Sequence, residues 1–421
     1  MAEPIRVGII GCGRILPAHL RGYATLRAKG YDNFRITALL SRRREDAEMF
    51  RKRGQGPTPR EPVSKNPGDP LSAPHRYVSD FQSDVDAEVF DDFDALLHSG
   101  TVDALDIPAS VFTHHDYAVR AADAGKHILV QKPLSVSVAA GRVIVEAARR
   151  NGVVCEVTEN VRYALPSRAA RWAIERGEIG EVQMVASVAI GTLDWSPDKI
   201  VADTPWRHLR RQAGGGATLD IGVHLFHRVR FLCGEVQSVS ALARTFEPVR
   251  YRRDARGTVL DSVTPDADDA FMATFQLANG GIGQISFTWA GHGEPTSLPD
   301  GMVIYGSRGC LKGNTLHRDG KAPVSVVDLF HAEATTEERA HWMPLGLSDS
   351  FAAGFYDYFR SIEDHRQPEA SGEEGLRDVA TSFAIIESSE SGRPVLVDDV
   401  LSGRVRAAQR SIDEYHNLLQ A

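Results

Sequence analysis

The chain has 421 residues, of which 42% are apolar and 25% are charged, and its formal net charge is -8. This length predicts two or three domains, with two large ones favoured, and the composition is that of an ordinary soluble globular protein. Because the charge is negative and no strongly basic domain stands out, the sequence argues against a nucleic-acid-binding protein.

Neither a membrane segment nor a secretory leader is expected. No apolar run is long enough to cross a bilayer, and the N-terminus enters a strand without the basic and apolar regions of a signal peptide. The cysteines lie far apart, without the paired spacing of zinc or redox sites. The four cysteines are Cys12, Cys155, Cys233 and Cys310. These patterns predict a cytoplasmic protein with no metal site.

A glycine turn follows the first predicted strand. The apolar run Val7–Ile10 leads into the turn, and Ala18–Lys29 has the pattern of a helix. Glycine lets a backbone approach a pyrophosphate, and the N–H groups at a helix start attract anions. Leu16 replaces the third glycine of the usual fingerprint, so a plain turn is the alternative. We expect a dinucleotide to contact this turn at Gly11, Gly13, Arg14 and Ile15.

The second predicted strand, Phe34–Leu40, ends in a hydroxyl and basic residues instead of an acid. An acid at this position holds the ribose 2′-OH of NAD, whereas arginines favour the 2′-phosphate of NADP. The alternatives are a solvated helix start and an arginine that stacks on adenine. The expected contacts are Ser41, Arg42 and Arg43.

Strands and helices alternate again after a long surface insertion at residues 53–74. The insertion is rich in Pro, Gly, Arg and Ser, and we expect it to be disordered or to lie over the cofactor or a neighbouring subunit. The alternation predicts a parallel sheet covered on both faces. The expected strands are Ala104–Ile107, His127–Val130 and Val153–Val157, and the helices are Phe93–His98, His115–Ala124 and Gly141–Asn151.

Polar residues follow the last two of these strands, at the edge where parallel sheets bind ligands. Pro133 forces an extended or turned backbone at Lys132. We expect Lys132 to meet a substrate hydroxyl or the nicotinamide ribose, and a solvated surface lysine is the alternative. Further groups for the same crevice are Asn160, Arg162 and Tyr163.

The dinucleotide-binding domain is expected to span residues 1–160, and a second domain residues 161–421. An antiparallel sheet with helices on one face leaves its other face uncovered, which favours a homodimer or homotetramer. The expected strands are Val182–Ile190, Val236–Phe246, Asp269–Leu277, Gly281–Ala290 and Met302–Tyr305, and the helices are Pro166–Arg176, Phe351–Asp364 and Leu376–Ser389.

Two features of the second domain suggest ligand binding. The irregular stretch Thr192–Gly216 carries tryptophans and cations, which suit a polyol or anionic sugar and equally suit a subunit interface. Beyond it, Asp220 and His224 lie one helical turn apart, so the carboxylate can orient the imidazole as a base. A helix cap with a structural histidine is the alternative. The candidate residues in the irregular stretch are Trp195, Lys199, Trp206 and Arg207.

Together these motifs resemble the Gfo/Idh/MocA family of glucose-fructose oxidoreductase and inositol dehydrogenase. The resemblance rests on the glycine turn with His19, on Lys132–Pro133, on residues 124–127, 160–163, 177–180 and 214–224, and on 279–280 and 305–309. It implies an α/β protein with a Rossmann domain and an α/β domain built on a large, mostly antiparallel open sheet. It also implies a tightly bound NAD or NADP.

By the same resemblance, Lys132, Asp220 and His224 fall on the family's catalytic residues. The implied cofactor contacts also include Ser110, His114, Gln131, Lys132, Asn160, Trp206 and Arg207, and the implied substrate contacts are Lys132, Arg162, Tyr163, Trp195, Arg207, Asp220 and His224. The chain departs from the family at Gln131, where glutamate is usual, at His227, where an acid is often found, and in its long insertion.

The expected chemistry is hydride transfer at a ring hydroxyl carbon of a sugar or glycoside, without nucleic acid, membrane or metal. His224 would take the hydroxyl proton while Lys132 stabilises the alkoxide. A second hypothesis is an NAD-dependent glycosidase that oxidises C3 transiently, eliminates the aglycone, adds water and reduces the sugar again, with an anionic glycoside such as a sulfo-sugar as substrate. A third is a nucleotide-sensing protein without catalysis.

Overall fold

The computed structural model describes residues 3–191, 204–254 and 256–419. The chain folds into two compact units, each assembled from separate segments. The first unit comprises Met1–Leu134, Gly141–Tyr163 and Leu345–Gly375, and the second comprises Ser135–Ala140, Ala164–Pro344 and Leu376–Ala421. Among the described residues, no helix is both long and apolar enough to span a membrane.

The first unit is built on a six-stranded parallel sheet of order β3-β2-β1-β4-β5-β6. This order, with two halves running outward from β1, is that of a Rossmann fold, as the resemblance implied. The third strand is one that the sequence analysis did not predict. The strands are β1 Ile5–Ile10, β2 Phe34–Leu40, β3 Glu88–Phe90, β4 Ala104–Ile107, β5 His127–Gln131 and β6 Cys155–Thr158.

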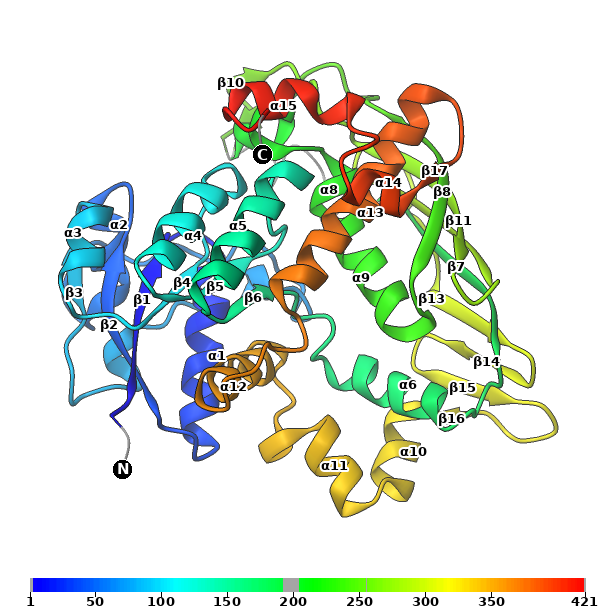
Figure 1. The fold of residues 1–421 in the computed structure, drawn as a ribbon, viewed down its shortest axis with the longest axis horizontal. Coiled ribbons are helices and arrows are strands. Elements are labelled where there is room, and N and C mark those ends of the chain that lie inside the picture. The colour runs from blue at the N-terminus through cyan, green and yellow to red at the C-terminus, as the bar shows by residue number, and fades with distance from the viewer. Residues whose placement is uncertain (1–2, 192–203, 255, 420–421) are drawn as a thin grey trace. The chain divides into compact units, whose positions relative to one another are not determined.

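Helices connect these strands close to the predicted positions (Figure 1). One short helix, α2, lies between β2 and the insertion and was not predicted. The insertion itself has a defined course, and two of its residues, Ser64 and Ala73, are buried. The helices are α1 Leu16–Ala28, α2 Arg44–Arg51, α3 Phe93–His98, α4 His114–Asp123, α5 Val138–Asn151 and α12 Ser350–Glu363.

Helix α12 belongs to the first unit although it comes late in the chain, beside α1 in Figure 1. Tyr23 of α1 stacks on Phe355 with ring centroids 4.2 Å apart, and Phe34 of β2 stacks on Phe359 at 4.9 Å. A Cβ on Gly22 would lie 2.8 Å from Phe351, so the two helices meet where α1 has no side chain. The aromatic residues of this helix therefore complete the core of the first unit. The sequence analysis had placed the helix in the second domain.

The second unit holds a nine-stranded sheet of order β16-β15-β14-β13-β7-β12-β11-β8-β17, together with a separate two-stranded β9–β10 sheet. Within the large sheet β7 and β12 are parallel and the other pairs are antiparallel, which confirms the mostly antiparallel sheet. The strands are β7 Val182–Ile190, β8 Val236–Arg244, β9 Arg250–Arg253, β10 Val259–Val263, β11 Ala270–Leu277, β12 Ile282–Thr288, β13 Thr296–Gly306, β14 Gly309–Lys312, β15 Thr315–Arg318, β16 Val324–Ser325 and β17 Val395–Leu396.

The helices of the second unit include two C-terminal ones, α14 and α15, that the sequence analysis did not predict. The helices of this unit are α6 Leu165–Glu175, α7 Arg210–Ala213, α8 Ala217–Asp220, α9 Gly222–Cys233, α10 Val326–Glu333, α11 Thr336–Trp342, α13 Gly372–Ser391, α14 Val397–Leu401 and α15 Arg410–Tyr415.

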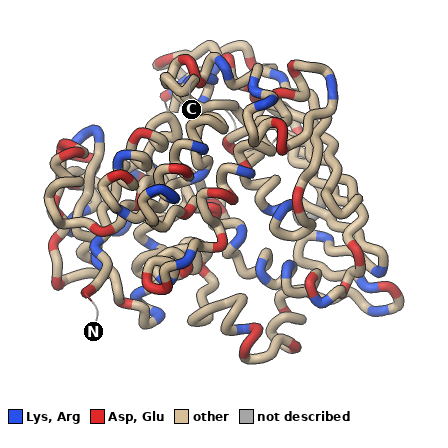
Figure 2. Tube along the Cα trace, in the orientation of Figure 1, with Lys and Arg blue, Asp and Glu red and all other residues tan. Residues whose placement is uncertain are grey.

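Charged residues of both signs alternate along the chain without a large region of one sign (Figure 2). The central strands of the large sheet are different. On β11 the buried residues alternate with the exposed Met272, Thr274 and Gln276, and on β12 the exposed residues are Ile282 and Gln284. On β11 and β12 one face is therefore apolar and packed, and the other is exposed to solvent and carries uncharged side chains.

Candidate active site

The glycine turn after β1 has the geometry that a dinucleotide needs. Gly11 has a φ of +107°, and a Cβ there would lie 2.8 Å from the backbone of Ala109. At Gly13, by contrast, none of the atoms in the described ranges lies within 4 Å of the Cβ position. Helix α1 begins directly after Ile15, with Pro17 in its first turn. Close backbone packing on one side and open space on the other fit a pyrophosphate at a helix start.

The predicted contacts at the end of β2 lie on the surface of the same unit. Ser41 follows the strand and is half-buried, and Arg42 is exposed. Arg43 precedes α2 and donates from Nε and Nη2 to Asp46, at 3.1 and 2.9 Å. Because these groups follow β2, they stand at the carboxyl edge of the parallel sheet, where Rossmann folds bind the adenosine ribose.

His114 connects the turns that follow β4 and β5. Its ring is 1% exposed, with Nδ1 3.0 Å from the carbonyl oxygen of Pro133 and Nε2 3.1 Å from that of Ala109. Burial lowers the pKa of His114, against the opposing effect of these carbonyl groups. The ring therefore supports the two turns, while Ser110 accepts from Thr113 through its carbonyl oxygen.

Lys132 directly follows β5, and a buried chain of side chains holds its backbone. The Lys132 N–H donates to Gln131 Oε1 at 2.7 Å, and Gln131 Nε2 lies 3.0 Å from His19 Nε2. His19 Nδ1 lies 2.8 Å from Asp106 Oδ2, which also accepts the Tyr23 hydroxyl at 3.0 Å. His19 is 0% exposed and Asp106 1%. These hydrogen bonds thus anchor the backbone at Lys132 to the core of the first unit.

The direction of each hydrogen bond in this chain follows from its donors. The Lys132 N–H can only donate, so Gln131 Oε1 accepts it and the Gln131 amide nitrogen donates to His19 Nε2. His19 therefore carries its proton on Nδ1 and donates it to Asp106. Gln131, the departure from the family pattern, is the residue type that pairs with a neutral imidazole. The resemblance had drawn attention to His19, whereas Asp106 and Tyr23 were missed.

The residues after β6 pack against the segment that contains α12. Asn160 Nδ2 donates to Ser350 Oγ at 3.1 Å, and Arg162 Nη1 donates to the carbonyl oxygen of Glu369 at 2.6 Å. The Tyr163 hydroxyl donates to Asp357 at 2.8 Å, and Tyr163 is 1% exposed. Tyr163 is thus packed inside the first unit, and its expected contact with substrate stays a prediction.

In the second unit, a glycine run fixes the start of α8. A Cβ on Gly214 would lie 2.3 Å from the carbonyl oxygen of Val136, and one on Gly216 would overlap Asp268. The Asp268 carboxylate accepts the backbone N–H groups of Gly216 and Thr218 at 2.9 and 2.8 Å. Burial raises the pKa of Asp268 in spite of these donors. The glycines are therefore required for close packing.

Asp220 ends α8, Ile221 joins the two helices, and His224 is the third residue of α9. Asp220 Oδ2 accepts a hydrogen bond from Arg207 Nη1 at 2.5 Å, and the Arg207 guanidinium lies 4.6 Å from the Trp206 ring centre. The structure thus joins two predicted groups, Asp220 and Arg207, that the sequence analysis had treated separately. The orientation of His224 by Asp220 stays a prediction.

The predicted Trp195 and Lys199 lie outside the described residues. The rest of the stretch that was expected to be irregular contains a 3-10 turn at Pro205–His208 and α7. No group of His, Cys, Asp and Glu side chains that could hold a metal occurs in the part of the chain that the structure describes.

His227, the other departure from the family pattern, belongs to the core of the second unit. It is 1% exposed, and its Nδ1 lies 2.6 Å from Asp378. Arg230 Nη1 donates to the same carboxylate at 2.5 Å. Burial alone would raise the pKa of Asp378, but His227 and Arg230 lower it below its usual value. The side chain of His227 is therefore a structural partner of Asp378.

The strand order and the glycine turn define the first unit as a dinucleotide-binding fold. Comparison with family models agrees. Residues 68–159 match the NAD-binding Rossmann fold of the Gfo/Idh/MocA oxidoreductase family, and residues 167–312 match the Gfo/Idh/MocA C-terminal domain. The chain belongs to this family, and it is an enzyme of the oxidoreductase class.

Curated relatives cover most of the chain at low identity. Levoglucosan dehydrogenase of Pseudarthrobacter phenanthrenivorans is 26% identical over 319 residues, which are 71% of this chain and 80% of that protein. The 1,5-anhydro-D-fructose reductase of Ensifer adhaerens is 28% identical over 303 residues, 72% of this chain and 82% of that protein. A solved structure of levoglucosan dehydrogenase in complex with NADH and L-sorbose superposes with a TM-score of 0.74 at 22% sequence identity. The match covers 94% of this chain and 100% of that chain. That likeness shows the fold.

Proposed function

We propose that the protein transfers hydride between a nicotinamide dinucleotide and a ring carbon of a sugar or glycoside that carries a hydroxyl group. One observation carries the proposal: Lys132 follows β5 at the same carboxyl edge of the parallel sheet as the glycine turn after β1. Two relatives that are named for sugars support the substrate class.

The residues of the first unit fit a dinucleotide. Gly11 and Gly13 would hold the pyrophosphate, because one packs closely and the other borders open space. Ser41 and Arg43 would contact the adenosine ribose. When bound, the nicotinamide ring accepts or donates the hydride. We expect the nucleotide to bind tightly enough to copurify with the protein.

Three side chains would supply the remaining chemistry. As a carbinol is oxidised, its hydroxyl loses a proton, which His224 accepts. The Lys132 ammonium stabilises the developing alkoxide, and Asp220 keeps the imidazole oriented. Acid–base assistance of this kind contributes about 10²–10⁴ in rate. The Arg207 contact holds the Asp220 carboxylate in place.

The test is a panel of sugars and pyranosides with either nucleotide, followed by absorbance of the reduced nicotinamide and mass spectrometry of products. We expect Lys132→Ala to lower kcat by about 10²-fold or more while nucleotide binding is retained. Lys126→Ala is the matched control, because Lys126 precedes the same strand at its amino end and donates to the carbonyl of Val102. Wild-type turnover by Lys132→Ala would refute the proposed role.

A glycosidase that oxidises its substrate transiently is the second candidate. The Arg207 guanidinium over the Trp206 ring favours it, because a sugar stacks on an aromatic face while guanidinium binds an anionic group. Release of aglycone at constant absorbance of the reduced nicotinamide would select this reaction over a net dehydrogenation. Nucleotide binding without either reaction would instead indicate a sensing protein.

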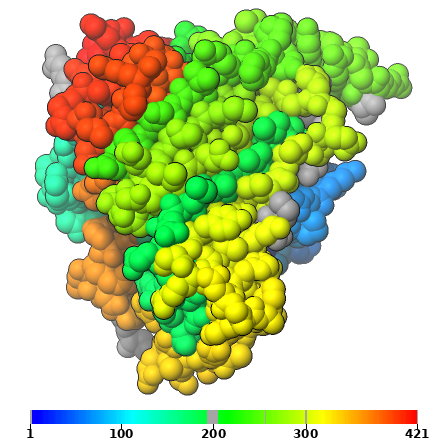
Figure 3. Space-filling model, turned by 90° about the vertical axis from the view of Figure 1, so that its right-hand side faces the viewer, coloured from blue at the N-terminus to red at the C-terminus, as the bar shows by residue number. Residues whose placement is uncertain are grey.

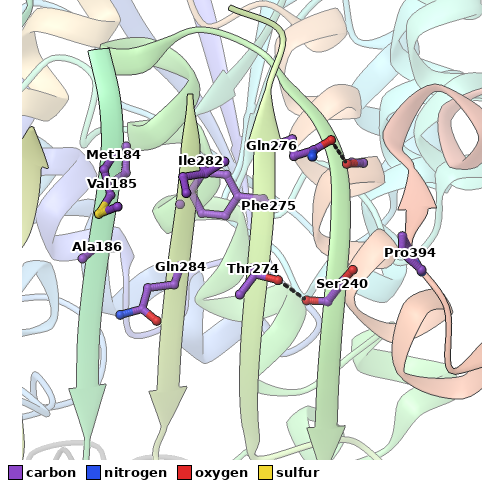
Figure 4. A pocket seen from close by; sticks show the side chains of 12 residues that line it. Met184, Val185, Ala186, Ser240, Thr274, Phe275, Gln276, Ile282, Gln284 and Pro394 are labelled. Atoms are coloured by element: carbon purple, nitrogen blue, oxygen red, sulfur yellow. Dashed lines mark hydrogen bonds between the residues drawn. The ribbon is translucent and has the colours of Figure 1, made fainter. Parts of the chain in front are cut away.

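We also propose that a second copy of the chain covers the open face of the large sheet. Figure 3 shows this face, in which β7, β12, β11 and β8 lie side by side. A shallow hollow of about 590 Å³ on it is lined by neutral side chains of these strands, including Met184, Ile282, Gln284 and Thr274 (Figure 4). Met184 is 48% exposed and Met272 58%. An uncharged face with exposed apolar groups suits a sheet-to-sheet homo-oligomer.

The cytoplasm is the proposed location. All four cysteines are free of disulfides, although Cys12, Cys155 and Cys233 are buried. Disulfides persist mainly in oxidising compartments, so unpaired thiols in the core favour a reducing one.

A further inference from the structure

The insertion brings an additional arginine to the end of β2. Arg60 contacts the Asp46 carboxylate through Nη2, and its Nη1 donates to the carbonyl oxygen of Cys12 in the glycine turn at 3.4 Å. Asp46 is the carboxylate that Arg43 also pairs with, at 2.9 Å. Cys12 lies against the last residue of β2, because its Sγ is 3.9 Å from the carbonyl oxygen of Leu40. Two arginines from different segments thus share one carboxylate beside the glycine turn.

The insertion is folded so that Arg60 has a defined position. The backbone N–H groups of Val63 and Ser64 donate to the carbonyl oxygen of Leu71 at 3.1 and 3.3 Å, which closes a compact loop. Just beyond it, His75 stacks on Phe50 of α2 with ring centroids 4.6 Å apart. The Arg60 side chain is 33% exposed, so it is anchored by its partners and still accessible to a ligand.

The charges at this place favour an anion. Arg42, Arg43 and Arg60 gather where an NAD-specific site carries an acid, and the residue directly after β2 is Ser41. Asp46 is 16% exposed; Arg43 contacts both of its carboxylate oxygens, and Arg60 approaches Oδ1, which the two arginines share. A phosphate dianion offers more acceptor oxygens and more charge than this carboxylate, and arginine binds phosphate in a bidentate manner.

We propose that Arg60, together with Arg43, binds the 2′-phosphate of a nicotinamide dinucleotide and thereby makes the protein selective for NADP(H). The proposal rests on the proposed function. In the absence of the phosphate, Asp46 holds both guanidinium groups in place. A ligand with a 2′-hydroxyl leaves these ion pairs as they are, whereas a 2′-phosphate competes with Asp46 for the two arginines. The insertion, which the family resemblance marks as unusual, is therefore a cofactor-specificity element.

The experiment is calorimetric titration of the purified full-length protein with NADPH and NADH, and with 2′,5′-ADP and 5′-AMP as probes that differ in the 2′-phosphate. We expect the wild-type protein to bind NADPH and 2′,5′-ADP more tightly than NADH and 5′-AMP. Arg60→Ala should weaken binding of the two phosphorylated ligands by about tenfold or more, and of the other two by less than about threefold.

Two further variants make the test independent of misfolding. Arg53→Ala is the matched control, because Arg53 lies in the same insertion but pairs with Asp80 on the surface, and it should bind all four ligands as the wild type does. Asp46→Asn should strengthen binding of 2′,5′-ADP, because it removes the competing charge.

Other outcomes would overturn the proposal. If Arg60→Ala weakens NADH and NADPH equally, Arg60 only supports the glycine turn. If the wild type prefers NADH, the site does not select the 2′-phosphate and the proposed function still stands. If neither nucleotide binds to the wild type, the proposed function fails as well.

Discussion

The two large sheets bury their strands in different ways. In the six-stranded sheet β4 and β6 are buried at every position, because helices cover both faces. In the nine-stranded sheet β11 alternates between buried residues and the exposed Met272, Thr274 and Gln276. Polar side chains have different constraints in the two settings. Inside the first sheet a polar group without a partner is costly, and Asp106 is paired with His19 and Tyr23, whereas on the open face of the second sheet a neutral polar group can stay in contact with water.

The two sheets place their functional surfaces differently. The first unit fixes the backbone at Lys132 through a chain of buried hydrogen bonds. The second unit leaves an uncharged surface that another chain can cover. Substitutions of a buried polar residue in the first sheet and of an exposed one in the second test this contrast directly.

The largest effect on stability is expected for Asp106→Leu. It leaves the Nδ1–H of His19 and the hydroxyl of Tyr23 without an acceptor in the core, which should cost about 2–5 kcal/mol in unfolding free energy. Thr274→Leu, on the open face of β11, should change the unfolding free energy by less than about 0.5 kcal/mol. Urea unfolding measures both, and similar losses for the two variants would contradict the contrast.

A smaller, pH-dependent loss is expected for Gln131→Glu. The new carboxyl would face His19 Nε2, which is an acceptor, so the folded variant must bind one proton more than the wild type. In the unfolded state this carboxyl has a pKa of ~4.3. The folded state raises the pKa of this carboxyl. The unfolding free energy of the variant should therefore be closest to that of the wild type below pH ~4.3 and fall by about 1–3 kcal/mol as the pH rises toward 8. Thermal unfolding at pH 5 and pH 8 measures the difference, and a loss independent of pH would exclude the assigned tautomer of His19.

A gain in stability is expected for Glu156→Gln in β6. Burial, reinforced by Asp357 and Glu369, raises the pKa of Glu156 well above its usual value. A raised pKa stabilises the folded state only while the pH is below the unfolded value, and this stability is lost as the pH rises through the folded pKa. The variant should therefore be more stable than the wild type at pH 8, by about 1–2 kcal/mol, with the difference shrinking toward pH 5.

The exposed Glu88→Gln is the control for this change and should be neutral at both pH values. If Glu156→Gln is less stable than the wild type at pH 8, the buried carboxylate has a compensating partner and the assigned direction of its pKa is wrong.

The smallest effect on unfolding, but a clear one on assembly, is expected for Met272→Arg. Its side chain points to solvent from β11, so the folded monomer should lose less than about 0.5 kcal/mol. A charge at the centre of the proposed interface should raise the dissociation constant of the oligomer at least tenfold. Val259→Arg, in the exposed β10, is the control. Light scattering after gel filtration measures the mass, and an unchanged oligomer would place the interface elsewhere.

Much of the fold could be predicted because its strands are local patterns. Phe34–Leu40 and Ala104–Ile107 were predicted with the bounds that the structure gives. The short β3, Glu88–Phe90, was missed because only its middle residue is fully buried, which gives no periodicity. The place of α12 in the first unit was also missed. Its aromatic face predicts burial, but no local pattern states which sheet or helix will cover it.

The candidate site was predictable in the residues that carry motifs, and less so in their supports. Asp106 could have been found, because a charged residue within the buried run Ala104–Ile107 requires a partner. Its connection with His19 and Gln131 depends on the order of the strands in the sheet. His19 and Gln131 are 112 positions apart in the chain, so no local pattern joins them. The pairing of Arg60 with Asp46 depends on the fold of an aperiodic insertion, for which the sequence offers no pattern.

Helix α12 also affects how the protein is made. The ribosome releases the N-terminal sheet first, and Tyr23, Phe34 and Gly22 are then without the aromatic residues that cover them in the finished molecule. N-terminal domains generally fold during synthesis. Here the nascent Rossmann sheet has an uncovered apolar surface until residues 350–363 have emerged, by which time nearly all of the second unit's strands have been translated. Completion of the nucleotide-binding unit is therefore a late step in the synthesis of the chain.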